Sequence, residues 1–169
     1  MLPGLAQLES TPEIFRILFD GLSEQDAVWK PATDRWSLAE VMEHLSHVEG
    51  HGFRSRIDQM LNTTLPEITE YDQEAFARAG QYSGRDFEDS FAHWEDQRES
   101  NVEFLRSLKD DILPREARHE RLGIITIAEL LNAWAFHDMG HLRQVIEILR
   151  ARRHYPDMGP FRSIYEIHP

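Results

Sequence analysis

Apolar residues recur at helical spacing along four stretches of this 169-residue chain. The first stretch follows residues 10–12, where Ser-Thr-Pro offers capping residues and then a proline at the first helical position. The second opens at Ser37 and keeps one apolar face to about Leu61. Because apolar residues three and four apart align on one side of a helix, we expect a long helix in each stretch.

Two further helices are expected in the second half of the chain. The third begins around Ser83 to Asp86 and ends near Lys109, and the fourth runs from Thr126 to about Arg153. The second and fourth helices open with the sequences SLAE and TIAE. Each is a capping box, in which a hydroxyl and a glutamate three residues later satisfy the free amides of the first turn.

The pattern predicts an all-α fold, a four-helix bundle with a long link between helices 2 and 3. Residues 63–82 form this link, in which a short helix can end near Gly80. No stretch alternates apolar and polar residues over a strand's length, and LGIITI at residues 122–127 is too short to carry a sheet. The length suits one domain covering residues 1–169.

Composition narrows the classes of function. The net charge of −12 disfavours a phosphate backbone as a ligand, so we expect no nucleic-acid partner. With no cysteine, any metal must be held by His, Asp or Glu. No signal peptide is visible and no run reaches the roughly 20 apolar residues of a membrane span, so a soluble cytoplasmic protein is expected.

His137 and His141 are the most informative polar residues. Both fall on or near the apolar face of the fourth helix, with Trp134 and Val145. Each imidazole could be a core histidine with a hydrogen-bonded partner. Alternatively, the spacing of four residues sets both rings over one patch, where a single cation can take a nitrogen from each.

The second helix offers a third ligand. His44 lies at the edge of its apolar face, whereas His47 falls on the solvent side and His51 between the two. His44 could instead be a boundary histidine bonded to a neighbouring helix. The remaining histidines show no such pattern and are interpreted as surface or loop residues: His93, His119, His154 and His168.

Two motifs resemble those of the DinB-like superfamily, and the resemblance covers nearly the whole chain. RWSLAEVMEHLSHVE matches a Trp-Ser/Thr-x-x-Glu…His-Leu pattern. LGIITIAELLNAWAFHDMGHLRQVIEILR matches a Gly…Glu-Leu…His-Asp-x-x-His-x-x-Gln pattern. Carried over by position, the metal ligands of the family correspond to His44, His137 and His141.

The resemblance implies a four-helix bundle, a homodimer and one divalent ion, zinc or nickel first, with iron or manganese as further candidates. Characterised members look like transferases that join a low-molecular-weight thiol to an electrophile, and others look like hydrolases or isomerases. Three readings therefore stay open for this chain: a thiol S-transferase acting on a small-molecule substrate, a metal-dependent hydrolase, and a non-catalytic metal-binding or interaction bundle.

Several neighbours of the histidines have two interpretations. Asp138 could orient an imidazole from behind or sit in a salt bridge, and Gln144 could form a hydrogen bond near the site. Glu49 could accept a proton, but its angular position favours contact with solvent or an arginine. We interpret Trp36 and Trp134 as core residues.

The homodimer has its own support in the sequence. Phe136 and Met139 fall on the outward face of the fourth helix, and Phe53 lies off the main stripe of the second. Exposed apolar residues gathered in this way suggest a partner surface. The alternative is that residues 63–82 or the C-terminal tail cover them.

Overall fold

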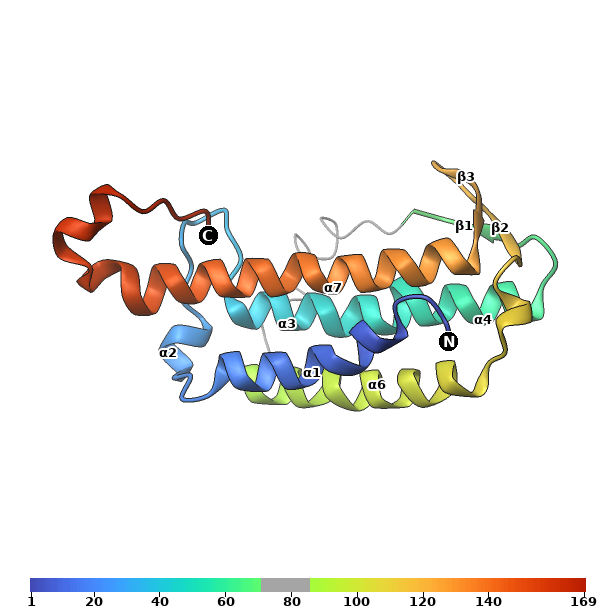
Figure 1. The fold of residues 1–169 in the computed structure, drawn as a ribbon, viewed down its shortest axis with the longest axis horizontal. Coiled ribbons are helices and arrows are strands. Elements are labelled where there is room, and N and C mark those ends of the chain that lie inside the picture. The colour runs from blue at the N-terminus through green and yellow to red at the C-terminus, as the bar shows by residue number, and fades with distance from the viewer. Residues whose placement is uncertain (71–85) are drawn as a thin grey trace.

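The computed structural model describes residues 1–70 and 86–169. Its long helical runs lie side by side along the long axis of the molecule (Figure 1). They are α1 (Leu5–Phe19); a run of α3 (Leu38–His47), η1 (Val48–Arg54) and α4 (Ser55–Asn62); α6 (Phe87–Ser107); and α7 (Ile127–Leu149). Helix α1 packs against α6 and α7, and α3 packs against the same two helices. The predicted four-helix bundle is therefore confirmed.

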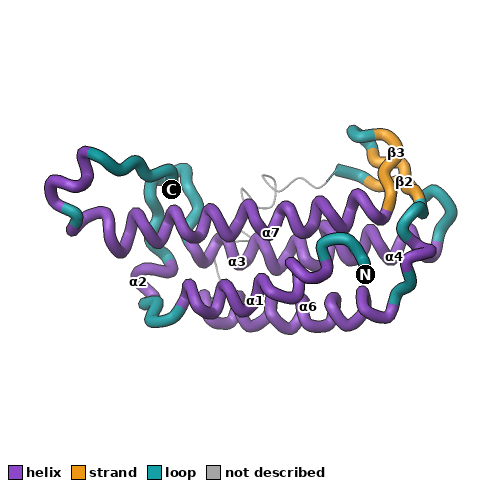
Figure 2. Tube along the Cα trace, viewed as in Figure 1, coloured by secondary structure: helices purple, strands orange, loops and turns teal. Residues whose placement is uncertain are grey.

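Shorter elements join and extend the four runs (Figure 2). Helix α2 (Glu24–Ala27) follows α1, and η2 (Asp110–Ile112) follows α6. Beyond α7 come three further short helices: η3 (Arg150–His154), η4 (Tyr155–Asp157) and η5 (Gly159–Ser163). The short helix expected to end near Gly80 lies outside the described residues.

Both capping boxes form as predicted. The Ser37 hydroxyl accepts the backbone N–H of Glu40 at 3.2 Å, and the Glu40 carboxylate accepts the Ser37 N–H at 2.8 Å. Thr126 and Glu129 repeat this exchange at 3.2 and 2.7 Å. These local bonds explain why α3 and α7 begin where the sequence indicated.

The start of the first helix was predicted wrongly. Helix α1 begins at Leu5, so Pro12 lies inside it rather than at its first position. Leu5 and Leu8 are buried and extend the apolar face of the helix toward the N-terminus. The capping residue, Gly4, has φ +72°, and a Cβ there would stand 2.8 Å from Ala135 and 2.9 Å from the carbonyl oxygen of Leu131, so tertiary contact with α7 decides the start.

The expectation that no sheet forms was also wrong. Strand β2 (Glu116–His119) pairs antiparallel with β3 (Gly123–Thr126) and parallel with β1 (Glu67–Ile68). The strands have two to four residues, too few for an alternating pattern to stand out. A hairpin turn and the backbone pairing define them, and they lie at one end of the bundle beside the start of α7 (Figure 1).

The second helical run contains a π-helical segment, η1, between α3 and α4. A π turn holds more residues than an α turn, so it rotates the following side chains relative to an ideal α-helical wheel. This rotation explains why Phe53, expected off the main stripe, is buried and stacks on Trp134 with 5.0 Å between ring centroids. Phe53 is therefore not part of an exposed apolar surface.

The interior holds two apolar clusters, one toward each end of the bundle. The larger side chains of the first include Phe53, Ile57, Met60, Leu105, Ile127 and Trp134. Those of the second include Phe15, Phe19, Met42, Leu45, Trp94 and Leu142. Within the described residues, every helix is too short or too polar to cross a bilayer.

Candidate metal centre

The structure brings together the three histidines selected from the sequence. His44 comes from α3, and His137 and His141 lie one turn apart on α7. The Nε2 atom of His137 is 3.2 Å from that of His44 and 3.1 Å from that of His141. One nitrogen from each ring lies within 4.8 Å of the others, so the three residues could hold a metal ion.

The spacing of these nitrogens fits a shared ion. Two nitrogens about 2.0–2.1 Å from one metal are about 3.4 Å apart at a tetrahedral angle and about 2.9 Å apart at a right angle. The separations of His137 from His44 and from His141, 3.2 and 3.1 Å, fall between these values. The donor set also fits, because neutral imidazoles suit zinc, nickel, iron and copper.

The surroundings keep the three rings neutral. Burial, together with the neighbouring histidines, lowers the pKa of His44 to about 2. Burial, His141 and the Arg98 charge together lower the pKa of His137 to about 3. Burial also lowers the pKa of His141, although Gln144 and Asp138 oppose the shift. Neutral rings present the lone pairs that a metal needs.

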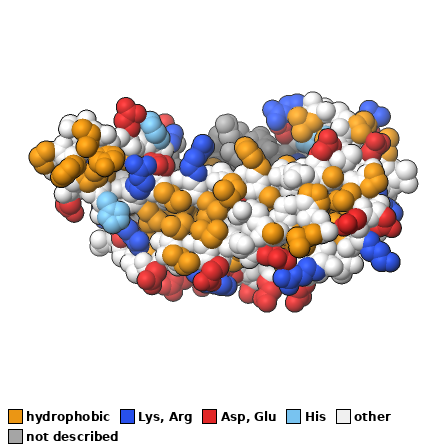
Figure 3. Space-filling model, in the orientation of Figure 1, with side chains coloured by type: hydrophobic (Ala, Val, Ile, Leu, Met, Phe, Trp, Pro, Cys, Tyr) orange, Lys and Arg blue, Asp and Glu red, His pale blue; other side chains and the backbone are white. Residues whose placement is uncertain are grey.

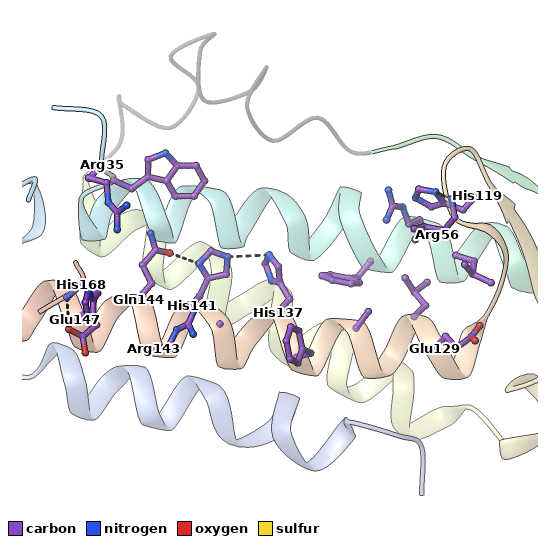
Figure 4. A pocket seen from close by; sticks show the side chains of 18 of the residues that line it. Arg35, Arg56, His119, Glu129, His137, His141, Arg143, Gln144, Glu147 and His168 are labelled. Carbon is purple, nitrogen blue, oxygen red and sulfur yellow. Dashed lines mark hydrogen bonds between the residues drawn. The ribbon is translucent and has the colours of Figure 1, made fainter. Parts of the chain in front are cut away.

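Gln144 orients one ring of the triad. Its side-chain carbonyl oxygen accepts a hydrogen bond from Nδ1 of His141 at 2.8 Å (Figure 4). With the proton on Nδ1, the Nε2 lone pair of His141 points toward the other two rings. Gln144 thus occupies the supporting position that the sequence proposed for it.

Asp138 forms a salt bridge, the second of its two predicted roles. It is buried, and its carboxylate accepts two hydrogen bonds from Arg98, at 2.6 and 3.0 Å. The same guanidinium binds Glu49 through two bonds of 2.7 and 2.8 Å. The two carboxylates outweigh burial and raise the pKa of Arg98. Glu49 therefore meets an arginine, one of its two expected environments, and is fully engaged there.

Arg98, Glu49 and Asp138 form a buried ionic cluster that connects several helices next to the triad. The carboxylate of Glu49 also accepts the side-chain amide of Asn101 at 3.1 Å and the indole N–H of Trp134 at 3.3 Å. Arg98 donates to the carbonyl oxygen of Leu8 at 3.1 Å. Since these residues come from α1, η1, α6 and α7, the cluster fixes the helices that carry the histidines.

A pocket of about 870 Å³ opens onto His137 and His141. Beside the two rings lie the apolar side chains of Phe53 and Phe136. Cationic residues line both ends, with Arg35 and Arg143 toward one end and Arg56 toward the other (Figure 4). A small molecule in this pocket would reach the histidine nitrogens.

Two pocket residues were interpreted differently from the sequence. His119 was taken as a surface or loop residue, yet it is only 5% exposed and lines the pocket. Trp36, interpreted as core, packs partly buried against the second apolar cluster, but it also lines the pocket, with 4.9 Å between the centroids of its ring and that of His44. The roles of both depend on contacts between distant segments, which helical spacing does not reveal. Trp134, in contrast, is a core residue as expected.

The comparisons with known proteins agree with this fold. The sequence model of the DinB superfamily matches residues 7–145. One similar solved structure is YfiT from Bacillus subtilis, described as a probable metal-dependent hydrolase with an unusual four-helix bundle topology. It has a TM-score of 0.77 and 21% identity over 87% of this chain and 84% of that one.

A second similar structure is the DinB-like protein YjoA from Bacillus subtilis. Its TM-score is 0.61 and its identity 17%, over 98% of this chain and 96% of that one. At these identities the two structures establish the shared fold. Among curated protein sequences, none matches the chain.

Proposed function

This chain belongs to the DinB superfamily, and from that premise we propose that it is a divalent-metal-dependent enzyme with His44, His137 and His141 as the metal ligands. The observation that carries the proposal is the convergence of three neutral imidazoles, two of which, His137 and His141, line a pocket, while His44 is buried against them. Three protein ligands leave further coordination positions for a substrate, which distinguishes a catalytic site from a closed structural one.

A divalent ion held there would act as a Lewis acid and lower the pKa of a small nucleophile, which then attacks at neutral pH. Our first candidate for the nucleophile is a low-molecular-weight thiol, transferred to an electrophilic substrate. Two carboxylates of α7, Asp138 between the two histidines and Glu147 beyond them, are bonded to Arg98 and Arg150. A thiol suits such a site, because its ordinary pKa of about 8.5 requires little help in losing the proton.

Water is the second candidate, which would make the chain a hydrolase. The description of YfiT as a probable metal-dependent hydrolase favours it. The same three histidines would serve either reaction, so the two candidates differ in what enters the pocket and agree on the ligands.

The metal site can be tested without knowing the substrate. We expect the full chain, purified without chelator and loaded with zinc or nickel, to hold one ion. Each of the single variants His44→Ala, His137→Ala and His141→Ala should lose most of it, as measured by elemental analysis and calorimetry. The exposed His51→Ala variant serves as the matched control. A triple-alanine variant that retains the parent's metal content would refute the site.

The reaction can then be tested with panels of nucleophiles. Metal-loaded protein should accelerate attack of glutathione, coenzyme A, bacillithiol or mycothiol on monochlorobimane, with His44→Ala as the metal-poor reference. Ester and amide substrates without thiol test hydrolysis in parallel. Rates equal to those of the reference with every thiol would exclude S-transfer while leaving the metal site standing.

A further inference from the structure

Arg56 and His119 lie together at one end of the pocket that opens onto the histidine triad (Figure 4). Arg56 belongs to α4 and His119 ends β2, so the small sheet brings a second polar group to the pocket wall. One end of the Arg56 guanidinium donates to the carbonyl oxygen of Thr69 at 3.0 Å. Within residues 1–70 and 86–169 its other N–H groups find no acceptor, and they remain available to a ligand.

The protonation state of His119 follows from its neighbours. Its Nδ1 atom accepts the backbone N–H groups of Arg121 at 3.2 Å and Leu122 at 3.4 Å. Burial lowers the pKa of the ring, and the Arg56 charge lowers it further, so the ring is neutral near pH 7. A neutral imidazole carries one proton, and because Nδ1 is an acceptor that proton sits on Nε2. His119 therefore offers an N–H donor next to a guanidinium.

Among the residues that the structure describes, Glu129 and Glu70 carry carboxylates near this end of the pocket, and both are already engaged. Glu129 accepts the backbone N–H and the hydroxyl of Thr126 in the capping box of α7. Glu70 forms an ion pair with Arg121 at 3.0 Å. Glu70 offsets part of the Arg56 charge, but its carboxylate does not line the pocket. The donors of Arg56 and His119 are thus left facing the cavity.

An apolar stretch separates these donors from the triad. The pocket lining includes Phe53, Ile125 and Leu130, and Phe53 lies between His44 and Arg56 in one helical run. Phe53 also packs edge-on against the His137 ring, with 5.6 Å between centroids. Arg56 lies twelve residues after His44 in the same helical run, which corresponds to on the order of 15 Å of helix. A ligand that spans both regions is extended and has an apolar middle.

We propose that Arg56 and His119 form a carboxylate-binding subsite, and that the substrate is an amphipathic acid whose carboxylate lies there while its reacting group lies at the triad. The guanidinium fork and the adjacent imidazole N–H match the two oxygens of a carboxylate. The inference rests on the proposed function for the identity of the reacting end. The subsite itself depends only on Arg56, His119 and the cavity.

A matched pair of fluorescent probes tests the subsite. Dansylglycine carries an aromatic group and a carboxylate, and dansylglycinamide differs only by a neutral amide. We expect the full chain to bind the acid about tenfold or more tightly than the amide, as is typical of charge-assisted hydrogen bonds. Arg56→Gln should remove most of this preference. His119→Asn should reduce it severalfold, because asparagine keeps an acceptor near Nδ1 and removes the Nε2 donor.

Arg118→Gln is the control, because Arg118 lies next to His119 on β2 but is exposed and does not line the pocket. Its preference should equal that of the parent. Repeating the titration with excess chelator separates this test from that of the metal site. Equal affinities for the two probes in the parent chain, a preference that survives Arg56→Gln, or an equal loss in Arg118→Gln would each overturn the subsite.

Discussion

At the residue scale, Arg98 supplies a hydrogen bond that Pro12 cannot make. A proline inside a helix has no N–H for the carbonyl four residues before it, which here belongs to Leu8. Arg98 donates to that carbonyl oxygen at 3.1 Å, while its remaining N–H groups bind Glu49 and Asp138. The buried arginine of α6 therefore satisfies the carbonyl group that the proline inside α1 leaves without its helical partner.

Removing the Arg98 charge should be costly. Arg98→Leu would leave Glu49 and Asp138 as two uncompensated buried carboxylates. We expect a loss of about 3–5 kcal/mol in the free energy of unfolding, measured in urea at pH 7. Arg106→Leu, on the same helix, removes an ion pair with Glu9 at the surface and should cost about 0–1 kcal/mol. Similar losses in the two variants would contradict a special role for the buried cluster.

At the residue scale, the triad could be predicted because its signal is local. His137 and His141 stand one turn apart, and His44 lies on the apolar edge of its helix. His119 and Arg56 could not be selected in the same way. They meet in one pocket because the β2–β3 turn brings β2 near α4. The apolar spacing of a single helix does not predict either feature.

At the element scale, the π-helical segment η1 interrupts the regular α-helix between α3 and α4. Gly52 lies in this segment at a position that has no room for a larger side chain. A Cβ at Gly52 would stand 2.7 Å from Cγ1 of Val48, whereas one at Gly50 would meet open space. Val48 is buried, and a β-branched side chain in a helix has little rotamer freedom to move aside. The glycine at 52 thus permits the close turn that buries Phe53.

Two alanine substitutions within η1 should have opposite effects. We expect Gly52→Ala to destabilise the chain by about 1–3 kcal/mol through overpacking against Val48. Gly50→Ala should stabilise it by up to about 1 kcal/mol, because alanine restricts the unfolded chain and meets no obstacle. Thermal melts followed by circular dichroism measure both. If Gly52→Ala were as stable as Gly50→Ala, the contact with Val48 would not constrain this segment.

Sequence predicted the elements that begin with local chemistry. The capping boxes placed the starts of α3 and α7, and Asp86, within the range given for the third helix, caps α6. The sequence did not predict the start of α1, the π turn or the strands. Each is decided by contacts that apolar spacing does not encode: those of Gly4 with α7, of Gly52 with Val48, and of β2 with β1 and β3.

At the scale of the whole molecule, the buried histidines make stability depend on pH. In the folded chain the pKa of His44 is about 2 and that of His137 about 3, against about 6.5 when unfolded. The unfolded state therefore binds more protons as pH falls below about 6.5, which destabilises the metal-free fold. We expect a loss of about 1.4 kcal/mol per pH unit for each such histidine between about pH 6 and 5.

Urea titrations of the chelated chain from pH 7.5 to 5 measure this slope. A variant with alanine at positions 44, 137 and 141 should show a much flatter dependence over the same range. The remaining slope would come from His47 and His119, whose pKa values burial also lowers. A parent chain whose stability stays constant from pH 7 to 5 would show that the three rings are not held neutral by the fold.

Exposed apolar side chains on α7 and α1 lead us to predict a homodimer. Phe136 and Met139 are 80% and 52% exposed on α7, where the sequence placed them, and Ile17 of α1 is also exposed. Apolar surface extends along α7 and α1 in the face seen in Figure 3. A second copy would cover such a patch, since apolar area removed from water stabilises an association.

Sedimentation at micromolar concentration should therefore give twice the 19.8 kDa mass of one chain. Phe136→Ser with Met139→Ser should shift the protein toward the monomer, because polar hydroxyls would replace apolar groups in the contact. Leu122→Ser is a suitable comparison, as Leu122 is 63% exposed but lies in the β2–β3 turn. A parent chain that sediments at the mass of one copy would rule out the dimer, and a dimer unaffected by the double substitution would place the contact on another face.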